Sequence, residues 1–197
     1  MTRVFLACGV VAGPLFIVTV LIQAQTRAGF DLGRHPISLL SLGPFGWIQV
    51  LNFAITGVLC VVCGVGLQRM GSVGNVIPAA VAEIGLGLVM AGLCITDPGA
   101  GFPPGAPEGA PDDFSWHGIL HEVGFALSQI GWLIFATSVI LRAPTPAWRW
   151  ISAIPPVLVL VLVAWPNMSG LSVRLLLATA VELGSVAVVA EICSRTP

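Results

Sequence analysis

The sequence predicts an all-α, polytopic membrane protein: a bundle of about six transmembrane helices with a re-entrant or short-helix outer segment. Apolar residues make up 56% of the 197 residues and charged residues only 9%, against about 25% charged residues in soluble domains. A helix needs about 20 mostly apolar residues to cross the hydrocarbon core. The segments that meet or approach this length are 4–24, 47–67, 76–95, 118–141, 151–165 and 173–192. We expect residues 1–197 to form a single transmembrane helical domain.

Two of these segments need separate comment. Segment 4–24 resembles a signal peptide in position, but it is long, contains Gly13-Pro14 and lacks a clear small-residue cleavage site, so we expect a retained span. Segment 151–165 is short and carries Pro155-Pro156 near its start. Because proline removes a backbone donor and disturbs the preceding turn, we expect that helix to begin irregularly.

Polar residues of the second segment recur at helical spacing. Their separations of 3, 4, 4 and 3 place them on one face, which must point inward. Either hydrogen bonding between helices or contact with a substrate accounts for this face. Its members are Gln49, Asn52, Thr56, Cys60 and Cys63.

The arginines predict the orientation in the cell membrane. All eight basic residues are arginine, and basic residues concentrate in cytoplasmic loops. With alternating spans, one side holds Arg3, Arg69, Arg142, Arg149 and Arg195, and the other holds Arg27, Arg34 and Arg174. This distribution predicts a multi-pass protein with a cytoplasmic N-terminus and with segments 25–46 and 96–116 on the outer face. The net charge of −1 excludes a nucleic-acid partner, which needs a basic surface.

The first outer segment combines charges with an apolar run. Arg27, Asp31 and Arg34 precede His35, and residues 37–42 are too apolar for a solvated loop. We expect those residues to dip back toward the bundle as a short helix, shielded by protein or by a wet cavity. The three charged residues either form an ion-pair cluster that folds the segment or contribute to a binding site.

The second outer segment and the start of the fourth span contain several ionisable residues close together in the sequence. Asp97 ends the third span, and His117 and His121 lie one helical turn apart at the start of the fourth, followed by Glu122. The Pro/Gly-rich stretch 99–111 is typical of a flap or an ordered coil over a site. Glu182 lies near the middle of the sixth span, where a charge costs about 2.5–3.5 kcal/mol on insertion scales. It is either a hydrogen-bonded structural acid or part of a site.

Several of these motifs resemble a known family. They are Gly13-Pro14-Leu15-Phe16, Arg27 to Asp31 with Arg34-His35-Pro36-Ile37-Ser38-Leu39, Gly46-Trp47 through Gln49, Asn52-Phe53, Thr56-Gly57, Thr96-Asp97-Pro98, and Gly118 to His121. Over roughly residues 5–140 they resemble the small actinobacterial integral-membrane proteins grouped as domain of unknown function 998. This resemblance implies a helical bundle of about six spans and no particular activity. The architecture is also similar, by analogy only, to small membrane-embedded terpene cyclases.

The first functional hypothesis is a membrane enzyme that cyclises a lipophilic, isoprenoid-type substrate without a cofactor. Acid initiation needs a carboxyl group kept protonated by an apolar site, and aromatic rings stabilise the resulting carbocations. Asp97 or Glu122 is the expected proton donor, His121 orients it or takes the final proton, and Asp31 is a further catalytic candidate. The expected substrate-binding residues are Arg27, Arg34, His35, Trp47, Asn52, Trp116, His117, Phe125, Trp132 and Glu182.

Two alternatives stay open. An intramembrane zinc hydrolase would take His35, His117 and His121 as ligands, because three protein ligands and a water suit catalytic zinc. A non-enzymatic transporter or lipid-binding protein would use its carboxyl groups to carry protons or to hold helices together. In every case the expected partner is a membrane lipid or a lipophilic small molecule, and a homodimer is expected for a transporter of this size.

Overall fold

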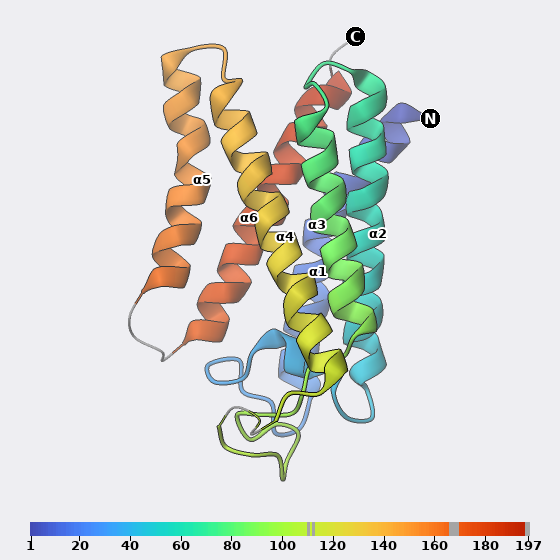
Figure 1. Cartoon of the computed structure of the whole chain (residues 1–197), viewed down its shortest axis with the longest axis vertical. Helices are drawn as coiled ribbons and strands as arrows, with labels where there is room; N and C mark the ends of the chain where they lie inside the picture. Colours follow the sequence, from blue (N-terminus) through green and yellow to red (C-terminus); the bar gives the residue numbers. More distant parts are fainter. Residues whose placement is uncertain (110, 112, 166–169, 196–197) are drawn as a thin grey trace.

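Six helices of transmembrane length form the protein. The computed structural model describes residues 1–109, 111, 113–165 and 170–195 (Figure 1). The helices are α1 (Thr2–Thr26), α2 (Gly46–Met70), α3 (Val76–Leu93), α4 (Trp116–Leu141), α5 (Pro146–Ala164) and α6 (Leu171–Arg195). The described residues contain no β-strand beyond a single bridge between Gly99 and Phe102. The all-α fold with six spans is therefore confirmed, and the chain is a multi-pass membrane protein.

The short helix expected in the first outer segment is also confirmed. It is the 3-10 helix η1 (Ile37–Ser41), and it packs on α1 and α2. Three of its own residues, Leu39, Leu40 and Ser41, are buried. Segments 27–45, 94–109 and 113–115 lie together at one end of the bundle, which we call the outer end, and the start of α1 and the end of α6 lie at the other (Figure 1).

The expectation for the fifth helix is wrong. α5 begins at Pro146, five residues before the predicted span, and continues through Pro155 and Pro156. Thr145 caps it, because its hydroxyl accepts a hydrogen bond from the backbone N–H of Trp148 at 3.3 Å. Proline is favoured at the first helical position, so the Thr145-Pro146 pair starts the helix and the two later prolines fall in its interior.

Each of the helices α1 to α4 packs against the next one in the chain, and α6 packs against α1. Glycines allow two of these contacts to be very close. A methyl group at Gly57 would lie 2.5 Å from the carbonyl oxygen of Gly85 on α3, and one at Gly87 would lie 2.5 Å from that of Gly124 on α4. Small residues at helix contacts are the usual way in which membrane helices approach each other.

The polar face of α2 points inward, as predicted, and all five of its members are buried. Gln49 accepts a hydrogen bond from Gln23 of α1 at 2.7 Å, and Asn52 donates one to the backbone carbonyl of Phe16 at 3.2 Å. This face therefore binds α2 to α1.

Helix α5 forms one edge of the bundle (Figure 1). It contacts α4 and α6, and Val159 is its one buried residue. Helix α5 therefore packs only loosely against its two neighbours, α4 and α6.

Candidate functional site

A cavity of about 1200 Å³ lies between α4 and α6. Its lining reaches from the outer segments to the middle of the bundle and includes residues of α1, α2, α3 and α5. Much of the surface is apolar and aromatic, with Phe16, Phe53, Phe125 and Trp132 among its residues. Its size and composition are those of a site for a lipophilic small molecule.

The most buried carboxyl group of the described cavity lining is that of Glu182 on α6. Its Oε2 accepts a hydrogen bond from Nε2 of Gln129 on α4 at 3.3 Å, and only 8% of Glu182 is exposed. Both residues lie near the middle of their helices. This contact joins α4 and α6 across the cavity at the depth where a bilayer tolerates polar groups least.

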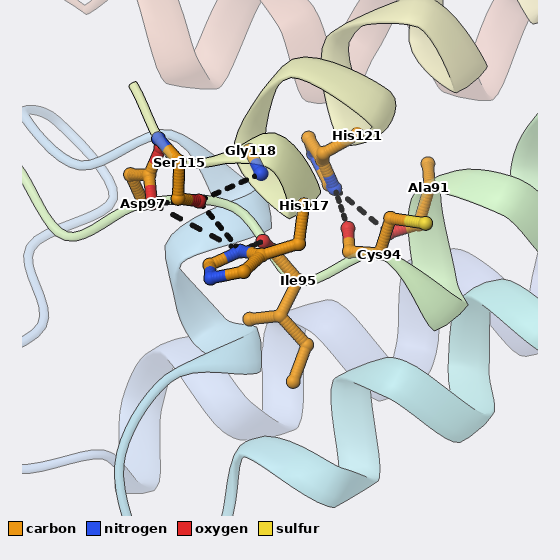
Figure 2. Close-up of polar contacts among 8 residues, drawn as sticks. All are labelled: Ala91, Cys94, Ile95, Asp97, Ser115, His117, Gly118 and His121. Carbon is orange, nitrogen blue, oxygen red and sulfur yellow. Dashed lines mark hydrogen bonds and ion pairs between the residues drawn. The ribbon is translucent and has the colours of Figure 1, made fainter. Parts of the chain in front are cut away.

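His121 lines the same cavity nearer the outer end. Its Nδ1 lies 2.7 Å from the carbonyl oxygen of Ala91 and 3.0 Å from that of Cys94 (Figure 2). Two carbonyl acceptors require the proton on Nδ1, which leaves a lone pair on Nε2. The eight residues from His121 to Gln129 correspond to about 12 Å along the helix axis. The cavity thus holds a potential base and a carboxyl group at two depths.

The start of α4 is fixed by a group of four residues, which we call the α4 clasp: Asp97, Ser115, His117 and Gly118 (Figure 2). The carboxylate of Asp97 accepts hydrogen bonds from the backbone N–H of Ser115 at 2.9 Å and from its hydroxyl at 2.6 Å. The hydroxyl oxygen of Ser115 in turn accepts a hydrogen bond from the backbone N–H of Gly118 at 3.0 Å. A methyl group at Gly118 would collide with the Asp97 carboxylate.

The α4 clasp favours the ionised form of Asp97. Burial by itself raises the pKa of this carboxyl, but the two hydrogen bonds from Ser115 and the imidazole of His117, 3.9 Å away, outweigh it and hold the pKa below its ordinary value. A proton donor at neutral pH needs the opposite shift. Asp97 therefore fits a role in fixing the N-terminus of α4 better than the expected role of initiating acid.

The two outer segments are joined at His35. Its Nδ1 accepts a hydrogen bond from the backbone N–H of Asp31 at 2.8 Å, and its Nε2 lies 3.1 Å from the carbonyl oxygen of Ala100. The ring also packs between Phe30 and Phe102, with centroid distances of 5.4 and 5.5 Å. His35 thus holds part of the cavity roof in place and lies outside the cavity lining.

The expected ion-pair cluster of the first outer segment does not form among the described residues. Arg27 donates to the backbone carbonyls of Leu40, at 3.0 Å, and Leu42, so it fixes the end of η1. Asp31 accepts a hydrogen bond from the backbone N–H of Gly33 at 2.8 Å. Arg34 pairs with Glu108 of the second outer segment.

The cavity contains seven of the residues predicted for a site. They are Arg34, Asp97, His121, Glu122, Phe125, Trp132 and Glu182. Trp47 and Trp116 lie elsewhere, with exposed fractions of 59% and 72%, as expected of residues at a membrane surface. Asn52 is placed in the contact with α1, His117 in the α4 clasp, and Arg27, Asp31 and His35 in the outer segments.

The three histidines of the zinc alternative do not come together. Nδ1 of His117 lies 2.7 Å from the carbonyl oxygen of Ile95, so His117, His121 and His35 each hold a backbone carbonyl at a different place. Among the described residues, no group of three or more His, Cys, Asp or Glu side chains is arranged to hold a metal ion. The arrangement does not fit the proposed ligand set.

Sequence reasoning did not identify Ser115, Glu108 and Phe102. A serine directly before a predicted span is a helix N-cap signal, so Ser115 was recognisable. Glu108 and Phe102 lie in a loop where no periodicity fixes their partners.

A family model described as a protein of unknown function, DUF998, matches residues 10–191. The chain belongs to this family. The match confirms the resemblance of the motifs and extends it through α5 and most of α6, where the sequence shows little beyond hydrophobicity. No curated protein and no solved structure matches the chain.

Proposed function

We propose that this member of the DUF998 family takes a lipophilic molecule from the bilayer into the cavity between α4 and α6. The observation that carries the proposal is the cavity itself, about 1200 Å³ in volume and bounded by membrane-spanning helices. Its size is that of sites that bury small organic ligands. At its rim, Phe125 is 45% exposed, which gives a hydrophobic molecule an apolar surface to approach from the lipid.

The orientation belongs to the same proposal. The end of the bundle that carries the start of α1 and the end of α6 has, at or near it, Arg3, Arg69, Arg142, Arg149 and Arg195. By the positive-inside rule this distribution supports a cytoplasmic position for that end, with the roof of the cavity facing outward from the cell membrane. Homodimerisation stays a prediction.

A second candidate function is acid-initiated cyclisation of an isoprenoid-type chain, and it is favoured by the positions of Glu182 and His121. The Glu182 carboxyl would give its proton to a terminal double bond or an epoxide, and the resulting carbocation would be attacked by a neighbouring double bond. Loss of a proton to Nε2 of His121 would end the reaction. The product would be an isomer of the substrate, since nothing is oxidised or reduced and one proton is taken up and released.

Filling the cavity tests the binding proposal. Thr179 lines the cavity, whereas Leu177 on the same helix is 50% exposed and lies outside the lining. We expect Thr179→Phe to weaken labelling by a photoreactive farnesol analogue about tenfold, a loss of about 1.4 kcal/mol, and Leu177→Phe to leave it unchanged. Mass spectrometry of the labelled peptides should locate the probe on α4 and α6. Equal labelling of both variants, or labelling confined to exposed faces, would contradict the proposal.

Product analysis tests the enzymatic candidate separately. Purified protein would be incubated with linear and epoxidised prenyl compounds, and products of unchanged mass would be separated by chromatography. We expect Glu182→Gln and His121→Ala to abolish such products, while Glu191→Gln, outside the cavity on the same helix, retains them. Absence of any isomeric product from the unmodified protein would remove the enzymatic candidate and leave the binding proposal standing.

A further inference from the structure

The charged groups of the cavity are unbalanced toward carboxyl groups. Among the described lining residues, the arginine is Arg34, the histidine is His121, and the acidic residues are Asp97, Glu108, Glu122 and Glu182. Arg34 and Glu108 pair at the roof, where their side chains are 50% and 81% exposed. The α4 clasp provides the partners of Asp97. The guanidinium of Arg34 is therefore paired, and Nδ1 of His121 is held by two backbone carbonyls, so the described part of the lining offers an anionic ligand no unpaired arginine.

Among the carboxyl groups of the described lining, Glu182 is the one most affected by the lack of a neighbouring positive charge. It is more than nine-tenths buried, and its hydrogen-bond partner in the described structure is a neutral amide rather than a cation. A carboxylate at this depth is costly unless a positive charge lies beside it. A ligand that brings such a charge would gain an interaction that the described lining residues do not supply.

The aromatic residues favour the same kind of ligand. Trp132 lies one helical turn beyond Gln129 on α4, and the lining also includes Phe16, Phe53, Phe114 and Phe125. Faces of aromatic rings attract cations, most strongly where water is excluded. Carboxyl and aromatic groups thus act together in a space large enough for a bulky organic molecule.

We propose that the ligand of this cavity is a lipophilic cation, an amine or quaternary ammonium carried on an apolar body, with its charge against Glu182. This inference rests on the proposed binding of a lipophilic molecule and gives that molecule its chemical class. Phosphate and carboxylate amphiphiles are disfavoured, because their charge would face carboxyl groups at low dielectric constant.

Three probes of the same shape test the charge preference: tetraphenylphosphonium, tetraphenylmethane and tetraphenylborate. Binding of each to the full chain in zwitterionic lipid nanodiscs is measured by equilibrium dialysis, with protein-free nanodiscs subtracted. We expect the cation to bind at least about tenfold more tightly than the neutral probe, and the anion to bind more weakly than the neutral one. Glu182→Gln should remove this preference while leaving the neutral probe within about twofold, and Glu182→Asp should retain it. Glu191→Gln is the matched control, because this α6 carboxylate pairs with Arg195 outside the cavity.

The outcomes distinguish the preference for a cation from the proposed binding of a lipophilic molecule. Equal binding of the cationic and neutral probes to the unmodified protein would overturn the charge preference and leave the binding site intact. A preference that survives Glu182→Gln, or is lost equally in Glu191→Gln, would remove Glu182 from the site. Failure of all three probes to bind, together with absent photolabelling of α4 and α6, would overturn the binding proposal itself. If Glu182→Gln does not fold, the unmodified protein and Glu182→Asp still decide the question.

Discussion

Two regions of the bundle differ in packing although their helices have similar hydropathy. One is the set of contacts among α2, α3 and α4, and the other is the region between α4 and α6. Half of the most apolar stretch of α2 and of α3 is buried, against 6% of that of α5. Glycines lie at the closest approaches of α2, α3 and α4, whereas no glycine of α6 is among the residues that line the cavity. Hydrophobicity is enough to place a helix in a bilayer, but close packing needs matched small residues. The cavity lies where that matching is absent.

The largest expected effect comes from adding a methyl group at a close contact between helices, with an unpacked position of α6 as the comparison. At Gly85 the new methyl would meet the carbonyl oxygen of Gly57, so we expect Gly85→Ala to lower the free energy of unfolding by about 2 kcal/mol or more. Gly184→Ala should leave it unchanged or raise it by up to about 1 kcal/mol, because alanine is the better helix former. Thermal unfolding in detergent micelles measures both. Equal destabilisation would show that the close approach of α2 and α3 at Gly85 does not limit the space for a methyl group.

Helix caps offer the next comparison, since α4 and α5 each begin at a capping hydroxyl. Ser115 caps α4 and also holds Asp97, while Thr145 caps the exposed α5. We expect Ser115→Ala to cost about 2 kcal/mol of unfolding free energy and Thr145→Ala about 0.5 kcal/mol, the two ends of the usual range for caps. Denaturant titration of both variants is the measurement. A larger loss in Thr145→Ala would mean that the α4 clasp is dispensable.

The α4 clasp also predicts how stability depends on pH. The pKa of Asp97 is lower in the folded protein than its ordinary value of 3.8. Its contribution to stability is therefore complete above that ordinary value and is lost as the pH falls through the folded pKa. As the pH falls below about 4, the unfolding temperature should decrease more steeply for the unmodified protein than for Asp97→Asn. Parallel curves would show that Asp97 is not stabilised as a carboxylate.

The smallest effect is expected at the roof of the cavity. The ion pair between Arg34 and Glu108 is largely solvated, with side-chain exposures of 50% and 81%, and such pairs contribute little. We expect Arg34→Ala to change the free energy of unfolding by about 0.5 kcal/mol or less. A loss several times greater in chemical denaturation would show that this pair fastens the two outer segments as firmly as His35 does.

Sequence reasoning succeeded where local patterns decide the outcome. Apolar length identified the six spans, the run bounded by Pro36 and Gly43 identified η1, and helical spacing identified the buried face of α2. The prolines at 155 and 156 predict an irregular start for the fifth span, but α5 begins at the capping pair Thr145 and Pro146. Because a threonine followed by proline is a local signal for a helix start, the sequence contains the information that gives the correct start.

The cavity was not predictable in the same way. Gln129 and Glu182 are 53 residues apart in the chain, and no periodicity relates one helix to another. The partners of Asp97 depend on the path of a long loop that carries Ser115 back to it. The spacing of polar residues in the sequence predicts that several of them gather near one end of the bundle. Which of them line the cavity and which hold the loops depends on how the helices pack.

The exposure of α5 has a consequence for how the protein is made. A helix with one buried residue, Val159, gains little from docking onto the finished bundle, so the free energy that keeps it in the membrane must come from its own transfer into lipid during synthesis. In the two-stage description of membrane protein folding, insertion and assembly are separable, and α5 completes almost all of its contribution at the first stage. Helices α2 and α3, whose hydropathy is at least as high, gain further stability at the second stage, when they pack against each other.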